Sequence, residues 1–424
     1  MTTAPVPLPR GIGLPPARTI TLRTRGAVSP PAPTVVRQKS AVNVLVRLAF
    51  YLFVLSIPFE MPNRSIPIEI PTITGCLFLL ATFIQPTVAY RRIPGAVVWF
   101  IVWLWVFGLS TLINRGDHVD LIAIQSASQL QLLLILWACA NILRDRKTLR
   151  GTLLTFAFAT AVRAAMQLAH VATTVTPLWT GGERVTVLGQ NANLSAIILS
   201  AGLVTVLTMR PRIIAWPSAA MIGAALIQTG SRGGLLCAAG GIMVLLLQGK
   251  HRVRSIIFGL VALMLLGVAA WQSEMFRARI LAADEGSLAG RENIYPATIG
   301  MISEKPWLGW GPTENQYEIA KRIGEENKDR RDAHNILLEL LSATGIIGAV
   351  PFLAGMWACW VAAWRARKGA LHLLPLAFLV TVLIGCISGT WIASKILWLA
   401  FAIALATGGL VQTQQDARRR SCAV

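Results

Sequence analysis

Apolar residues dominate the chain in long runs that are separated by short polar or basic breaks. A run of about 18–20 apolar residues is long enough to cross the roughly 30 Å hydrocarbon core of a membrane as an α-helix. The pattern therefore predicts an all-α polytopic membrane protein with about twelve transmembrane helices. They are expected at residues 41–58, 71–89, 95–113, 121–142, 151–175, 194–208, 213–228, 234–248, 255–271, 336–364, 371–388 and 394–411.

One long polar segment, residues 272–335, interrupts this pattern between the ninth and tenth spans. Residues 272–333 hold 11 of the 19 acidic residues. Charges paired at helical spacing predict a polar helix over residues 318–332. The sequence Pro-Trp-Leu-Gly-Trp-Gly-Pro at 306–312 predicts a rigid aromatic turn. Because ordered loops of this length are usually functional, we expect the chemistry of the protein here.

The net charge of +20 would suggest nucleic acid as a partner of a soluble protein. Alternate returns between the spans, together with both ends of the chain, carry 23 of the 39 basic residues and only two acids, Asp145 and Asp416. This is the positive-inside bias of membrane topology. It excludes a nucleic-acid function, and it predicts that both termini lie in the cytosol and that the 272–335 loop lies on the opposite side, which is the periplasm for a bacterial inner membrane.

The chain is thus expected to divide into five parts. Residues 1–40 form a disordered basic cytosolic tail, rich in Pro and Arg. Residues 41–271 form helices one to nine, 272–335 the periplasmic loop, 336–411 helices ten to twelve, and 412–424 a cytosolic tail. None of the six cysteines lies in the loop and no metal-ligand spacing is present, so no disulfide, metal or cofactor is expected.

His334 is the first candidate for chemistry, because histidine can take a proton near neutral pH. It lies where the loop meets the tenth span, in the sequence Arg-Asp-Ala-His-Asn. A solvated histidine at the membrane interface is the alternative interpretation.

Two arginines outside the cytosolic segments are candidates for binding an anion. Arg232 lies in the Gly-rich turn Thr-Gly-Ser-Arg-Gly-Gly, where exposed N–H groups and a planar guanidinium suit phosphate oxygens. Arg291, in Gly-Arg-Glu-Asn, follows the same reasoning. The alternatives are an interfacial arginine for Arg232 and a surface pair with Glu292 for Arg291.

Five further residues are candidates for substrate binding. Arg184 precedes a stretch of amides that includes Asn193 and that could cap the sixth span or hydrogen-bond a sugar. Arg163 lies near the middle of the fifth span, where a charge is expensive and usually faces a cavity or a partner. Trp307 and Trp310 could stack on sugar rings. Lys395, at the start of the last span, is expected to extend outward to water.

These sequences, taken in order, resemble the motifs of the O-antigen ligase and polymerase superfamily. The His-Asn pair at 334–335 is followed by Gly-Ile-Ile-Gly at 345–348, and Ser-Arg-Gly at 231–233, Gly-Arg at 290–291 and Pro-Trp-Leu-Gly-Trp-Gly at 306–311 precede it. Each motif is short, but their order and the twelve-span topology cover essentially the whole chain.

The resemblance implies a metal-independent membrane glycosyltransferase of the GT-C-like type. It would transfer a glycan from undecaprenyl pyrophosphate to a sugar hydroxyl of lipid A–core at the periplasmic face of the bacterial inner membrane, with inversion. By motif, His334 would be the general base, Arg232 and Arg291 would bind pyrophosphate, and Asn335 would contact substrate. Arg184 and Asn193 match a looser Arg…Asn element, although Ala192 stands where family members often have Pro.

Two alternatives to this function fit the same residues. An O-antigen polymerase or a protein O-oligosaccharyltransferase of the same superfamily would use another acceptor. A non-catalytic lipid-glycan transporter would need charges along mid-membrane spans and a repeat, for which only Arg163 and Arg47 offer support.

Overall fold

Most of the predicted apolar spans correspond to helices in a computed structural model of the chain. It describes residues 41–60, 69–116, 118–177, 183–247, 291–324 and 330–421, and scattered positions between 253 and 277. Eleven apolar helices lie among these residues, and each overlaps one predicted span. Only scattered residues of the predicted ninth span, 255–271, are described, so the number twelve stays a prediction.

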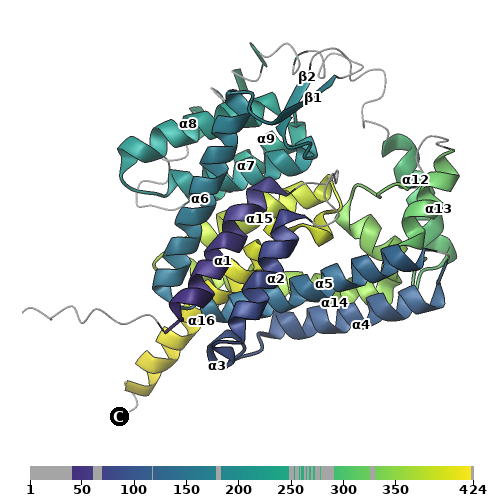
Figure 1. Cartoon of the computed structure of the whole chain (residues 1–424), viewed down its shortest axis with the longest axis horizontal. Helices are drawn as coiled ribbons and strands as arrows, with labels where there is room; N and C mark the ends of the chain where they lie inside the picture. Colours follow the sequence, from purple (N-terminus) through teal and green to yellow (C-terminus); the bar gives the residue numbers. More distant parts are fainter. Residues whose placement is uncertain are drawn as a thin grey trace, which may run out of the picture. The chain divides into compact units, whose positions relative to one another are not determined.

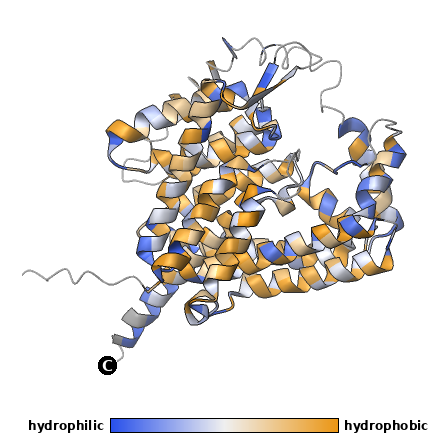
Figure 2. Ribbon diagram, in the orientation of Figure 1, coloured by the Kyte–Doolittle hydropathy of each residue, from blue (hydrophilic) through white to orange (hydrophobic). Residues whose placement is uncertain are grey.

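The apolar helices differ in length, and their bounds are as follows. They are α1 (Val44–Ser56, continued by η1, Ile57–Phe59), α2 (Ile70–Thr82), α4 (Gly95–Ile113), α5 (Val119–Ile142), α6 (Arg146–Leu168), α7 (Ala192–Leu207), α8 (Arg212–Gln228), α9 (Arg232–Leu246), α14 (Ile336–Ala366), α15 (Leu374–Ile387) and α16 (Lys395–Ser421). Five of them, α4, α5, α6, α14 and α16, are long and apolar enough to cross a membrane. They indicate an integral membrane protein, and Figure 2 shows the hydrophobic residues along them.

Side-chain caps begin the helices that carry or approach the candidate residues. Asp145 caps α6, Asn191 caps α7, Ser231 caps α9 and Asn335 caps α14, each with its side chain accepting from a backbone N–H of the first turn. These residue types satisfy the free donors of a helix N-terminus. The caps place Arg232 and His334 immediately beside two helix starts.

The core forms where α4, α14 and α16 pack together and where α15 packs against α7 and α9 (Figure 1). Between α4 and α14, the ring of Phe352 lies edge-on to Phe100 at 5.2 Å and to Trp103 at 5.0 Å. Edge-to-face aromatic pairs add to the stability from burial. The helices that carry the candidate site are therefore tied to a rigid aromatic core.

Three local predictions differ from the structure. The polar helix expected at 318–332 is instead α13, Glu314–Ile323, which ends because Gly324 adopts φ +67°. The end of the predicted fifth span is a strand, β1 (Thr173–Pro177), paired antiparallel with β2 (Glu183–Val187), so the fold is mostly but not entirely helical. The last helix, α16, continues ten residues beyond residue 411.

The aromatic turn of the loop docks on a break in α14. Gly345 there adopts φ +61° and ψ −168°, which interrupts the helical hydrogen bonds. The turn replaces them, because Ile346 N–H donates to the Pro306 carbonyl at 2.8 Å and Trp310 N–H donates to the Ser342 carbonyl at 2.8 Å. The aromatic turn at 306–312 and the Gly-Ile-Ile-Gly motif at 345–348 are thus joined by backbone hydrogen bonds.

The same contact also holds α4. Ser110 Oγ lies 2.6 Å from the Leu308 carbonyl and 2.9 Å from the Ala343 carbonyl. Lys305 Nζ donates to Asn114 Oδ1 at 2.8 Å. The loop helix α12 (Arg291–Glu304), which leads into this turn, is therefore fastened to both α4 and α14.

Replacing Gly345 by Ala is expected to lower the free energy of unfolding by about 2 kcal/mol or more, because a non-glycine residue at positive φ is strained. The new Cβ would also overlap the Trp307 carbonyl oxygen. Thermal unfolding of the detergent-solubilised protein measures the change. Gly95→Ala is the control, because nothing lies within 4 Å of its added Cβ. Equal midpoints for the two variants would contradict the docking role.

Candidate functional site

The C-terminal end of α15 is the point on which several candidate residues converge. Arg291, at the start of α12, donates from Nη2 to the Ser388 carbonyl at 2.8 Å. Asn335 donates from Nδ2 to the Ile387 carbonyl at 3.2 Å. A Cβ added to Gly233 would lie 3.1 Å from Ser388 Oγ, so the start of α9 also approaches this end. Three motifs that are far apart in the sequence therefore meet at one place.

His334 lies beside this meeting point, one residue before the Asn335 cap of α14. It is half-buried and adopts φ +51°, a left-handed conformation that is uncommon for a residue with a Cβ. The backbone before it is held by Glu339, whose Oε2 accepts from Ala333 N–H at 3.2 Å. Glu339 is itself buried and accepts from Asn315 Nδ2 at 3.0 Å. The protein thus holds His334 in a strained position.

Arg232 is the first residue of α9 and is also half-buried. The turn before it contains Gly230 at φ +61° and the cap Ser231, whose Oγ accepts from Gly234 N–H at 3.1 Å. Ser231 Oγ also donates to Asn193 Oδ1 at 2.9 Å. The turn is therefore fixed to the start of α7.

Arg184 and Asn193 lie in the same hydrogen-bonded network. Arg184, in β2, donates from Nε to the Thr229 carbonyl at 2.8 Å and from Nη2 to Asn193 Oδ1 at 3.2 Å. The amide that caps α7 is Asn191, not Asn193. Asn193 therefore joins the hairpin to the turn that presents Arg232, and both residues support that turn in the described conformation.

Arg163 is placed differently from its prediction. Because α6 ends at Leu168, Arg163 lies near the end of its helix rather than in the middle, and 0% of its surface is exposed. Its Nη2 donates to Gln190 Oε1 at 2.7 Å and to Ser195 Oγ, while Nη1 has no hydrogen-bond partner among the described residues. Gln190 Nε2 in turn donates to the Glu60 carbonyl at 2.7 Å. In this conformation Arg163 lies inside the protein and is bonded to Ser195 of α7, the helix whose Asn193 holds the Arg232 turn.

A buried ion-pair cluster adjoins Arg163. Lys395 is not extended toward water, as its position suggested, but is 5% exposed and contacts both Glu60, at 2.9 Å, and Glu69. Burial raises the pKa of Glu60, an effect that the neighbouring Lys395 opposes. The cluster joins the starts of α2 and α16, and removing one partner would leave a buried charge uncompensated.

The two tryptophans of the aromatic turn have different surroundings. Trp310 is half-buried, donates its N–H to the Met301 carbonyl at 2.9 Å, and has Lys305 Nζ 4.0 Å from its ring centroid. Trp307 is 65% exposed. Stacking of either ring on a sugar stays a prediction, and Trp307 has the more accessible ring.

Sequence reasoning missed several residues that position the site. The Ile387 and Ser388 carbonyls carry no residue-type signal, because any side chain would present the same oxygen. Ser231 and Glu339 did have a signal: a small polar residue directly before a helix, and an isolated acid in the first turn of an apolar helix.

The arrangement is suited to bind an anion and to move a proton. Arginine has five N–H donors, and the described contacts of Arg291 use only one. The N-termini of α9 and α14 add partial positive charge beside Arg232 and His334. Cationic groups beside a residue that can accept a proton fit the displacement of a phosphate-type leaving group by a hydroxyl.

Two comparisons with known proteins relate the chain to O-antigen ligases. Residues 216–353 match the sequence model of the O-antigen ligase family, a range that includes Arg232, Arg291 and His334. Over 164 residues the chain is 32% identical to an O-antigen ligase of Pseudomonas aeruginosa. That match spans 38% of this chain and 38% of the length of the relative. The resemblance to the O-antigen ligase superfamily, predicted from the motifs, is confirmed.

Proposed function

We propose that this chain, which carries an O-antigen ligase domain, transfers a glycan from undecaprenyl pyrophosphate to a sugar hydroxyl of lipid A–core. The reaction takes place at the periplasmic face of the bacterial inner membrane, with both termini in the cytoplasm and a GT-C-like helical fold. The observation that carries the proposal is the convergence of Arg291, Asn335 and the Arg232 turn on the end of α15, beside His334.

The chemistry is a single displacement. The acceptor hydroxyl oxygen bonds to the anomeric carbon of the donor glycan while the bond from that carbon to the pyrophosphate oxygen breaks. His334 takes the hydroxyl proton as general base. Arg232 and Arg291 stabilise the negative charge that develops on the departing undecaprenyl pyrophosphate. Attack from the face opposite the leaving group inverts the anomeric configuration.

The remaining candidates have supporting roles. Asn335 contacts the substrate from the start of α14, and Trp310, with the more exposed Trp307, lies along the loop that faces the acceptor sugars. Arg184 and Asn193 hold the Arg232 turn and contact the donor when the site is occupied. Arg163 and its buried partners support the donor side from behind.

Transfer by the purified full-length protein tests this function. Incubated with glycan on undecaprenyl pyrophosphate and with lipid A–core, the protein is expected to form glycosylated lipid A–core, at the same rate with and without EDTA. His334→Asn protein, prepared identically, is the control for contaminating enzymes. Loss of transfer in EDTA would contradict a metal-independent mechanism.

Exchanging the acceptor separates the alternatives. Product formed only when a second lipid-linked glycan or a protein replaces lipid A–core would identify a polymerase or a protein O-oligosaccharyltransferase. Movement of the donor across vesicle membranes without any new glycosidic bond would identify a transporter, and would contradict the proposed chemistry.

A further inference from the structure

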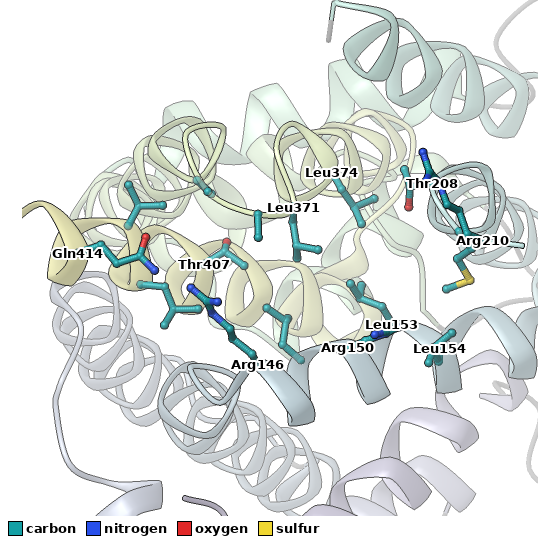
Figure 3. Close-up of a pocket in the computed structure, with 17 residues that line it drawn as sticks. Arg146, Arg150, Leu153, Leu154, Thr208, Arg210, Leu371, Leu374, Thr407 and Gln414 are labelled. Carbon is teal, nitrogen blue, oxygen red and sulfur yellow. The ribbon is translucent and has the colours of Figure 1, made fainter. Parts of the chain in front are cut away.

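A pocket lies at the other end of the helices that carry the candidate site. It has a volume of about 390 Å³, within the roughly 300–1,000 Å³ of many ligand sites. Its walls come from the start of α6, the α7–α8 turn, the α14–α15 turn and the second half of α16 (Figure 3). These segments include returns that the charge bias assigns to the cytosol. The pocket is therefore separate from the site at the end of α15.

The lining of this pocket has two chemical parts. Arg146, Arg150 and Arg210 supply its charges, and no acidic residue lines it. Most of the remaining lining is apolar, as at Leu153 and Leu374. All three arginines are exposed, whereas Leu374 is buried. A ligand for this pocket needs a negatively charged end at the water side and a hydrocarbon part that reaches between the helices.

The three positive charges are unfavourable without such a ligand. Arg146 and Arg150 are four residues apart on α6, a spacing at which like charges repel. Both also lie in the first turns of the helix, where the helix dipole favours negative charge. The nearby Asp145 caps the helix, accepting from Thr148 N–H at 2.9 Å and Thr148 Oγ at 2.7 Å, and does not line the pocket. Among the described residues, no carboxylate forms an ion pair with Arg146, Arg150 or Arg210.

We propose that this pocket binds an anionic phospholipid, with the phosphate of the headgroup on Arg146, Arg150 and Arg210 and an acyl chain along the leucines. The charge of the rim complements a phosphate, and the apolar wall complements hydrocarbon. A free phosphate ion would leave the apolar wall exposed, and a zwitterionic lipid would bring its own positive charge to three arginines.

Native mass spectrometry of the full-length protein, loaded with phosphatidylglycerol or phosphatidylcholine, measures this binding. Wild-type protein is expected to retain phosphatidylglycerol over phosphatidylcholine. The triple variant Arg146→Gln, Arg150→Gln, Arg210→Gln is expected to retain phosphatidylglycerol about tenfold less or weaker still, since each basic residue contributes to attraction for anionic lipid. Inorganic phosphate in excess should not displace the lipid.

A control of equal charge separates a site from general attraction to the membrane. Arg91→Gln, Lys147→Gln, Lys368→Gln removes three exposed charges on predicted cytosolic returns, none of which lines this pocket. Lys147 is the immediate neighbour of Arg146. This control is expected to retain phosphatidylglycerol like the wild type.

A fourth variant tests the apolar half and stays informative if the triple variant fails to fold. Ala370→Trp places a large ring at an exposed lining position and leaves all three arginines in place. It is expected to lose phosphatidylglycerol as well. Equal retention by all variants, equal loss in the charge control, or displacement by phosphate alone would each overturn the proposal.

Discussion

Replacing His334 by Asn is expected to lower the rate of glycan transfer by about a hundredfold to ten-thousandfold, the usual contribution of a general base. Asn can donate and accept hydrogen bonds but cannot take up the proton of the attacking hydroxyl. Because the proton moves in the transition state, the loss should appear in kcat, with little change in KM for the acceptor.

Asn is the informative replacement because of the backbone at this position. His334 adopts φ +51°, and Asn tolerates positive φ better than most residues with a Cβ. The variant should therefore keep the Asn335 cap and the contact of Asn335 with Ile387. Its thermal midpoint is expected to match that of the wild type, which separates loss of the base from loss of the fold.

The chain offers a matched control for this experiment. His372 also adopts positive φ, at +49°, and is exposed on a return that is predicted to be cytosolic. His372→Asn makes the same chemical change in the same backbone conformation and should leave transfer unchanged. Transfer by His334→Asn at the wild-type rate would return His334 to the role of an interfacial histidine.

The sequence predicted the helices best where local signals mark both ends. The apolar run of α4 is bounded by Pro94 and Asn114, and its predicted and observed bounds, 95–113, agree. The β1–β2 hairpin has no clear local signal, because Val171, Ala172 and Val175 prolong the apolar run of α6 and only the pairing with Val185 defines a strand. Charge pairing extends the predicted loop helix to residue 332, whereas α13 ends at Ile323 because Gly324 adopts a left-handed conformation.

The site was predictable in its residue types but not in its contacts. The candidate histidine and arginines can be identified from the sequence, because few charged or titratable residues lie beside the ends of the predicted membrane spans. Their partners are mostly backbone oxygens, as Ser388 is for Arg291 and Thr229 is for Arg184. Such partners are set by how distant helices pack, and the sequence has no local signal for that packing. The burial of Lys395 follows the same rule, because its partners Glu60 and Glu69 come from the other end of the chain.

Replacing Arg232 or Arg291 by Gln is expected to lower kcat/KM by about a hundredfold to a thousandfold, as is typical when one group that stabilises developing charge is removed. The pyrophosphate gains negative charge as the glycosidic bond breaks, so these cations act more strongly on the transition state than on the bound donor. The loss should therefore fall mainly on kcat. Combining both changes should cost less than the product of the single effects, because both arginines act on one leaving group.

Substitution by Lys separates charge from geometry. Arg232→Lys and Arg291→Lys keep a positive charge but lose the planar fork that binds two phosphate oxygens. Partial activity, between that of the wild type and the Gln variant, is expected for both. Arg291 also donates to the Ser388 carbonyl, so the thermal midpoint of each Arg291 variant must be compared with that of the wild type.

Arg91→Gln is the matched control, because Arg91 is an exposed arginine on a return that is predicted to lie on the opposite side of the membrane. It should transfer glycan at the wild-type rate. If Arg232→Gln and Arg291→Gln lowered the thermal midpoint but left kcat unchanged in the fraction that stays folded, the two arginines would be structural. The convergence at the end of α15 would then be a packing contact, and the leaving group would have to be stabilised elsewhere. Full loss of kcat with an unchanged midpoint would instead assign the leaving group to this pair of guanidinium groups.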